Sequence, residues 1–361
     1  MSVQVSYKKQ ITFWILFACI IVLVVEPIVR TYDYIFPNCT FLDSDVFENI
    51  KNEALKRDVC HSFYNLKWTD ANHISYEPNQ HFTVVNINDD GFRGPEISLE
   101  KEENVFRIFF LGGSTAFGAT ALSDMKTIPG YMQKLFDQVE LEQRIEIINA
   151  GIPGGYSYIE SKLISEKILE YNPDLLVIYD GYNDNYRSFD NYYFDTKETN
   201  STRDLLQYIL QNNFYKTPQF FYHQYFRAVF DSTELIVFDD SKKFEKSERW
   251  ANTWRDVCSE NESKGIKTII TLQPILGTGE KELTKEEKRN FDKYDGEKII
   301  KNYEFFAKQL EELSDSCTKI VDLRNSFDNE IETMFYDSVH TGDEGNKIIA
   351  KKIFDSMKDI I

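Results

Sequence analysis

The stretch "RIFFLGGSTAFG", Arg107–Gly118, decides the fold class of this chain. Its branched and aromatic run is typical of a buried strand, and two glycines and a serine follow directly. The small residues after them fit a turn that leads into a helix. A serine at such a turn either exposes its hydroxyl next to backbone N–H groups or simply caps the helix. Ser114 is therefore a candidate nucleophile, and its partners must come from elsewhere in the chain.

Strand-like and helical patterns alternate from this stretch to the C-terminus. Further strands are predicted at 145–150, 175–180, 267–273 and 318–323. Helices are predicted at 128–141, 157–172, 247–264, 295–314 and 343–359. This alternation predicts an α/β fold, a three-layer sandwich in which helices cover both faces of a five-stranded parallel sheet. At the start of the last helix, the T-x-x-E spacing of Thr341 and Glu344 predicts a capping box.

Ligands of parallel sheets bind at the carboxyl ends of the strands, so the residues that follow each strand are the candidates for chemistry. "NAGIPGG", 149–155, follows the second strand, and its glycines would let the backbone approach a ligand closely. "DGYNDN", 180–185, ends the third strand and continues past it, and an asparagine amide there could donate to a developing oxyanion. An ordinary strand-to-helix turn and an Asx turn are the plainer interpretations of these two stretches.

The last strand is followed by "DSVH", which runs from Asp337 to His340. Serine catalysis needs an imidazole that accepts the serine proton and a carboxylate that orients the imidazole. The chain has five histidines, and His340 is the one that follows a predicted strand in this way. Asp337 and His340 are therefore the candidate partners of Ser114.

The four blocks, taken in this order, resemble the SGNH hydrolase superfamily, also called GDSL esterases and lipases. The resemblance covers about residue 105 to the C-terminus and implies a flavodoxin-like sheet. It implies that Ser114 is the nucleophile, that His340 is the base and that Asp337 is the partner of the base. It also implies an oxyanion hole made by the N–H groups of Ser114 and Gly154 and by the side-chain amide of Asn183.

Two features qualify the resemblance. Gly113 stands where many members carry an aspartate, a residue that is not the nucleophile in the family. The preceding "GFRGPE", 91–96, together with the apolar N-terminus, looks like a membrane-attached branch that is often linked to surface polysaccharides.

The N-terminus predicts a membrane anchor. Residues 11–29 are almost entirely apolar and long enough to span a bilayer, and Lys8 and Lys9 precede them. The positive-inside rule then predicts a cytoplasmic tail at 1–10 and an extracytoplasmic remainder. A cleaved signal peptide would show small residues after the apolar run, which are not present here, and a buried helix of a soluble protein is the third possibility.

Beyond the anchor, the sequence predicts an extracytoplasmic N-terminal region at 30–103 and a hydrolase domain at 104–361. An aromatic-rich helical insertion is expected at about 185–246. It would form either a subdomain with its own core or a cap whose rings contact a sugar or an acyl chain. Tyr182 and Tyr186 flank Asn183 and are candidate substrate-binding residues.

Net charge, cysteines and sequons limit the partners and modifications that the chain can have. A net charge of −18 disfavours a nucleic-acid partner, because phosphate binding needs a basic surface. Two disulfides with three possible connectivities are open to the four cysteines that follow the anchor, and proximity in sequence favours Cys39–Cys60 and Cys258–Cys317. The chain has no C-x-x-C pair, so a zinc site is not expected. The acyl transfer that the resemblance implies needs no metal, and no cofactor is expected. Glycosylation sequons occur at Asn38, Asn200 and Asn261.

These observations predict an anchored, outward-facing serine esterase that removes an O-acyl group, expected to be O-acetyl, from a surface glycan through an acyl-serine. An O-acetyltransferase of a surface polysaccharide and a lipase or lysophospholipase would use the same residues. An α/β-hydrolase is a further alternative, because Gly112, Ser114 and Ala116 nearly form its nucleophile elbow. A non-catalytic glycan-binding protein that keeps the fold is the alternative outside enzymes.

Overall fold

The computed structural model describes residues 6–35, 39–67, 76–186, 216–217, 220 and 243–361. The chain divides into two compact units. One consists of Met1–Asn38 and Lys197–Val237, and the other of Cys39–Thr196 and Phe238–Ile361. The second unit contains the sheet, and it also includes the segment from Cys39 to residue 103.

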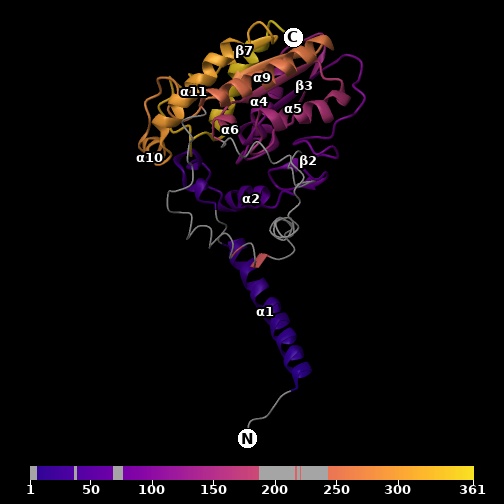
Figure 1. Ribbon diagram of the computed structural model, residues 1–361, viewed down its shortest axis with the longest axis vertical. Coiled ribbons are helices and arrows are strands. Elements are labelled where there is room, and N and C mark those ends of the chain that lie inside the picture. The colour runs from indigo at the N-terminus through magenta and orange to yellow at the C-terminus, as the bar shows by residue number, and fades with distance from the viewer. Residues whose placement is uncertain (1–5, 36–38, 68–75, 187–215, 218–219, 221–242) are drawn as a thin grey trace. The chain divides into compact units, whose positions relative to one another are not determined.

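Five parallel strands form the sheet of the second unit, as predicted (Figure 1). They are β3 (Val105–Gly112), β4 (Arg144–Asn149), β5 (Leu175–Asp180), β6 (Lys267–Leu272) and β7 (Lys319–Asp322). Their order across the sheet is β4-β3-β5-β6-β7. With β3 counted as the first strand this order is 2-1-3-4-5, the flavodoxin-like arrangement.

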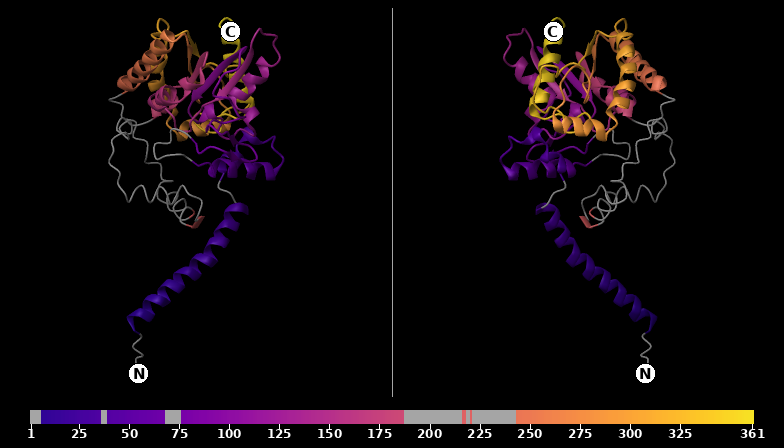
Figure 2. Two further views of the ribbon diagram at one scale, coloured as in Figure 1. Left: turned by 90° about the vertical axis from the view of Figure 1, so that its right-hand side faces the viewer. Right: turned by 90° about the vertical axis from the view of Figure 1, so that its left-hand side faces the viewer.

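Helices cover both faces of the sheet, which makes the three layers visible in Figure 2. One face is covered by α5 (Ser157–Glu166), α9 (Lys243–Ser263) and α11 (Gly296–Glu311), and the other by α4 (Ile128–Phe136) and α12 (Asp343–Met357). Alternate residues of β3 enter the two cores: Phe109 and Leu111 pack with the first set of helices, and Ile108 and Phe110 with the second. This period of two is what a strand buried on both faces requires.

The structure corrects the predicted capping box at Thr341 and Glu344. Gly342 is the N-cap of α12, and the Thr341 hydroxyl instead donates to Oδ1 of Asn346 at 3.2 Å. A capping box does occur two helices earlier, at α10 (Lys285–Lys293), where Thr284 and Glu287 exchange both bonds. The pattern T-x-x-E is present at both places, and the position at which the chain enters the helix decides which of them is used.

The segment before the sheet packs against the short helix that follows β3. It contains η1 (Thr40–Asp43), η2 (Asp45–Phe47), α2 (Glu53–Tyr64) and the short pair β1 (Gln80–His81) and β2 (Asn86–Ile87). Its buried side chains form a cluster that includes Phe117 from the helix after β3. The disulfide Cys39–Cys60 closes this segment, and Cys258–Cys317 joins α9 to the approach of β7, so the pairing favoured by sequence proximity is confirmed.

The first unit contains α1 (Tyr7–Ile35), which is long and apolar enough to cross a membrane, with a mean hydropathy of 2.5 in its most apolar window. Most of its large apolar side chains are exposed. Glu26 accepts hydrogen bonds from the backbone of Lys216 and Thr217 and pairs with Arg30.

Several predictions fall on undescribed residues. Most of the expected insertion and the sequons at Asn38 and Asn200 lie outside the described part of the chain. The third sequon residue, Asn261, is buried in α9, where its amide donates to the Thr268 hydroxyl. A folded chain therefore cannot present Asn261 for glycosylation.

Candidate active site

Ser114 lies at the carboxyl end of β3, where the sequence places it. β3 ends at Gly112, whose φ of +142° favours glycine and whose Cβ would lie 2.2 Å from the Tyr179 carbonyl oxygen. Gly113 is the N-cap of the short helix α3 (Ser114–Phe117), so Ser114 is its first residue and not its cap. The side chain of Ser114 points instead to His340.

Three side chains form a continuous hydrogen-bonded chain. Ser114 Oγ lies 2.6 Å from Nε2 of His340, and Nδ1 of His340 lies 2.7 Å from Oδ2 of Asp337. The second oxygen of Asp337 accepts the backbone N–H groups of Val339 at 2.9 Å and His340 at 2.8 Å. Because the carboxylate accepts at Nδ1, this nitrogen carries the proton and Nε2 accepts from the serine hydroxyl.

The two titratable partners stabilise each other's charged forms. Burial by itself would lower the pKa of His340, but the adjacent Asp337 carboxylate more than offsets this and holds that pKa above its ordinary value of 6.5. Burial would raise the pKa of Asp337, but the His340 charge and the hydrogen bonds from His340 and Val339 keep it below the usual 3.8. Asp337 therefore stays ionised and favours the protonated form of His340.

Helix α10 holds the loop that carries Asp337 and His340. Oε1 of Glu287 accepts the backbone N–H groups of Met334 and Phe335, and its Oε2 lies 2.6 Å from Nζ of the buried Lys281. The Asn290 amide donates to the Tyr336 carbonyl at 3.0 Å. Sequence reasoning missed this support, although the Thr284–Glu287 capping pattern was a signal for the helix.

An aromatic side chain covers one face of the His340 ring. The Tyr336 ring stacks on the His340 ring, with centroids 5.6 Å apart and planes at 12°. The rings of Phe41 and Phe47 pack against the Tyr336 ring, with centroid distances of 5.8 and 5.4 Å. The segment closed by the Cys39–Cys60 disulfide thus reaches His340 through the Tyr336 ring.

The predicted oxyanion donor Asn183 converges on the same turn. It lies in α6 (Tyr182–Tyr186), directly after β5, and its Nδ2 donates to the Gly155 carbonyl at 2.5 Å. A Cβ atom at Gly113 would lie 2.3 Å from this Nδ2, so the amide sits against the residue before Ser114. Gly154 precedes Gly155 in the same loop and has a φ of +75°. The loops after β3, β4 and β5 therefore meet at Ser114.

Of the two tyrosines predicted to contact substrate, the structure describes the side chain of Tyr182 alone. The Tyr182 hydroxyl lies 2.5 Å from Oγ of Ser338, and its side chain is largely buried. Tyr182 therefore links the Asn183 segment to the Asp337–His340 loop, and a substrate contact by its ring stays a prediction. The side chain of Tyr186 lies outside the described residues.

Three carboxyl groups near Gly155 are buried, and sequence reasoning did not find them: those of Glu160, Asp180 and Asp184. Asp184 accepts the backbone N–H and the hydroxyl of Ser157 at 3.0 and 2.5 Å, which fixes the start of α5 just after Gly155. Burial raises the pKa of Glu160 well above its usual range, and the nearby Asp180 and Asp184 add to this. These shifts favour a protonated, neutral Glu160 at this position.

Comparison with known proteins gives likenesses in fold. No protein-family model matches the chain, and no curated protein sequence matches it either. Among solved structures, the acetyl xylan esterase AlAXEase is 16% identical, with a TM-score of 0.42 over 71% of this chain and 100% of that one.

Two further solved structures give similar values. The acetylxylan esterase Axe2 from Geobacillus stearothermophilus is 17% identical, with a TM-score of 0.41 over 70% of this chain and 94% of that one. A protein from Parabacteroides merdae described as a GDSL-like lipase is 16% identical, with a TM-score of 0.44 over 73% and 98%. These three likenesses concern the fold, at 16–17% identity.

Proposed function

We propose that this chain is a serine ester hydrolase of the SGNH type. The observation that carries the proposal is the hydrogen-bonded series Ser114–His340–Asp337, with 2.6 Å between Ser114 Oγ and His340 Nε2. An imidazole at this distance acts as general base, a contribution worth about 10²- to 10⁴-fold in rate.

The proposed reaction has two halves. His340 takes the Ser114 proton while Oγ forms a bond to the ester carbonyl carbon, and the tetrahedral intermediate then collapses as the ester C–O bond breaks. The leaving alcohol takes the proton from His340, and an acyl-serine remains. Water then gives a proton to His340, its oxygen attacks the acyl carbon, and the carboxylic acid leaves as Ser114 regains its proton.

The negative charge of the intermediate would be held by the loop ends that meet at Ser114. The proposed donors are the N–H groups of Ser114 and Gly154 and the amide of Asn183. The support is the position of the Asn183 amide beside Gly113 and Gly155. Each donor aimed at the oxyanion is worth about 3 kcal/mol.

The proposed substrate is an O-acyl group, O-acetyl in the first instance, on a glycan outside the cytoplasm. The support for this location is α1, together with Lys8 and Lys9 before its apolar run, which favours a cytoplasmic N-terminus. Residues 1–10 would then be a cytoplasmic tail, 11–29 the anchor and 104–361 the hydrolase domain.

The test uses the full-length chain, purified in a non-ionic detergent. p-Nitrophenyl esters of increasing acyl length and acetylated xylo- and gluco-oligosaccharides are offered to the wild type and to Ser114→Ala. The proposal expects ester cleavage and free acetate from the wild type, highest activity on acetyl, and no activity from the variant.

Each other result has its own consequence. Preference for long acyl chains would overturn the glycan assignment in favour of a lipase. Acetyl transfer to an added sugar without release of acetate would replace the hydrolase by a transferase. Equal activity of the wild type and Ser114→Ala would overturn the proposed mechanism.

A further inference from the structure

Arg93, from the "GFRGPE" stretch, is a buried cation that the proposed chemistry does not use. Its side chain is fully buried, and its Nε lies 2.8 Å from Oδ1 of Asp124. A buried guanidinium is tolerated only when it is paired and hydrogen-bonded, and Arg93 meets both conditions. The direction of its remaining hydrogen bonds indicates what it holds.

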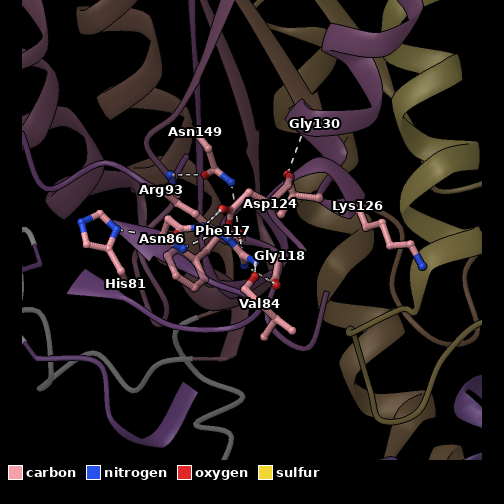
Figure 3. A network of polar contacts seen from close by, with 12 residues as sticks. His81, Val84, Asn86, Arg93, Phe117, Gly118, Asp124, Lys126, Gly130 and Asn149 are labelled. Atoms are coloured by element: carbon pink, nitrogen blue, oxygen red, sulfur yellow. Dashed lines mark hydrogen bonds and ion pairs between the residues drawn. The ribbon is translucent and has the colours of Figure 1, made fainter. Parts of the chain in front are cut away.

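Those hydrogen bonds go to the end of the nucleophile helix. Nη1 of Arg93 donates to the carbonyls of Phe117 at 3.0 Å and Gly118 at 2.8 Å, and Nη2 donates to Val84 at 2.9 Å (Figure 3). The guanidinium also lies over the Phe117 ring, 4.9 Å from its centroid. The Arg93 side chain therefore contacts both the backbone and the Phe117 ring at the end of α3.

A helix of one turn needs such partners more than a long helix does. The last carbonyls of any helix lack partners within it, and α3 consists only of Ser114–Phe117. Its backbone has few internal hydrogen bonds that could resist a shift of Ser114. The planar fork of arginine fixes two neighbouring carbonyls at once, which a lysine ammonium on a flexible stem does less well.

The same contact extends to the loop after β4. The backbone N–H of Arg93 donates to the Asn149 carbonyl at 3.1 Å, and the Asn149 amide donates to the Phe117 carbonyl at 3.1 Å. Oδ1 of Asn149 accepts the Gly151 N–H at 3.0 Å. Figure 3 shows Asn149 and Arg93 converging on Phe117. Arg93 thus ties the nucleophile helix to the loop that carries Gly154.

We propose that Arg93 is a positioning residue that holds Ser114 at hydrogen-bonding distance from His340. The proposal rests on the proposed esterase function. It assigns a positioning role to a residue outside the strands and helices of the sandwich, in the "GFRG" stretch that precedes β3. A displacement of about 1 Å at a reacting group can lower the rate about 100-fold, so a loosened α3 should be visible in kinetics.

Arg107, on the strand that leads to Ser114, offers a matched control. It is also buried, its Nε lies 2.6 Å from Oε2 of Glu146, and its Nη1 donates to the Tyr171 carbonyl at 2.8 Å. It lies near the beginning of β3, about 20 Å along the chain from Ser114. Replacing either arginine by lysine removes a buried fork, but only Arg93 touches the nucleophile helix.

The experiment compares Arg93→Lys, Arg107→Lys and the wild type as full-length chains in detergent. A fluorophosphonate probe gives two readings: the final extent of labelling reports the folded fraction, and the rate constant reports the reactivity of Ser114. The proposal expects both variants to lose thermal stability. It expects Arg93→Lys alone to label about 10- to 100-fold more slowly, with kcat on p-nitrophenyl acetate lowered similarly and KM little changed.

Equal rate constants for the two lysine variants would overturn the proposal, because Arg93 would then be structural only. Absence of labelling in the wild type would instead contradict the proposed function. If Arg93→Lys does not fold, Asn149→Asp replaces the other donor to the Phe117 carbonyl by a side chain of the same shape. A slower labelling rate of that variant supports the proposal, and an unchanged rate overturns it.

Discussion

The side-chain amide of Asn183 occupies the space into which a Cβ atom at position 113 would project, with 2.3 Å between that position and Nδ2. Gly113 has a φ of −76°, which other residues adopt readily, so its backbone does not require glycine. The close packing of the Asn183 amide against position 113 requires glycine instead. The glycine at the position where many SGNH enzymes carry aspartate is therefore matched to the placement of Asn183 in this chain.

Gly113→Ala should lower kcat by displacing the Asn183 amide. Loss of one oxyanion donor lowers kcat by about 10²- to 10³-fold, which is the loss expected for Asn183→Ala. The kcat of Gly113→Ala should fall nearly as far. A double-mutant cycle checks the cause. In the Asn183→Ala background, the alanine at 113 should change kcat by no more than about twofold, because the group that it displaces is gone. Full additivity of the two losses would show that Gly113 acts by another route.

The pH dependence of kcat/KM should follow His340. The base must be neutral, and Asp337 raises the pKa of His340 above 6.5, so activity should fall as the pH drops through a midpoint above that value. Asp337→Asn removes the charge that raises this pKa. The acid limb of the variant should move to lower pH, while kcat falls by about 10⁴-fold because the imidazole loses its orientation. An acid limb that stays in place would separate Asp337 from the titration of His340.

The strands and the meeting of Ser114, His340 and Asp337 were predictable because their signals are local. Short branched runs such as 175–180 favour buried strands, and parallel strands bring their carboxyl ends to one edge. Ser114 and His340 could therefore be paired without knowledge of any side-chain contact. The resemblance to SGNH hydrolases then supplied the role of Asn183.

The supporting contacts were not predictable, because they join residues that are distant in sequence. Arg93 and Phe117 are 24 positions apart, and Tyr182 and Ser338 are 156 apart. No periodicity marks such pairs. The wrong capping box at Thr341 has a different cause: the local pattern is present, but Gly342 and not Thr341 is the N-cap of the helix that begins at Asp343.

Glu287→Ala should destabilise the fold strongly. It would leave Lys281 as an uncompensated buried charge and deprive the backbone N–H groups of Met334 and Phe335 of their acceptor. Breaking a buried pair in this way costs about 3–5 kcal/mol in free energy of unfolding. Chemical denaturation of the full-length chain measures this loss. The exposed Glu297 gives the control, and its alanine variant should stay within about 0.5 kcal/mol of the wild type. Similar values for both variants would contradict the role given to α10.

The proposed mechanism requires that His340 activates Ser114, so removal of the imidazole must slow the reaction of the serine. Full-length wild type and His340→Ala are treated with a fluorophosphonate, the labelled peptide is identified by mass spectrometry, and the labelling rates are compared. We expect a single adduct on Ser114 and a rate lower by at least about 10²-fold in the variant. An adduct on another residue, or equal rates for the two proteins, would contradict the proposed mechanism.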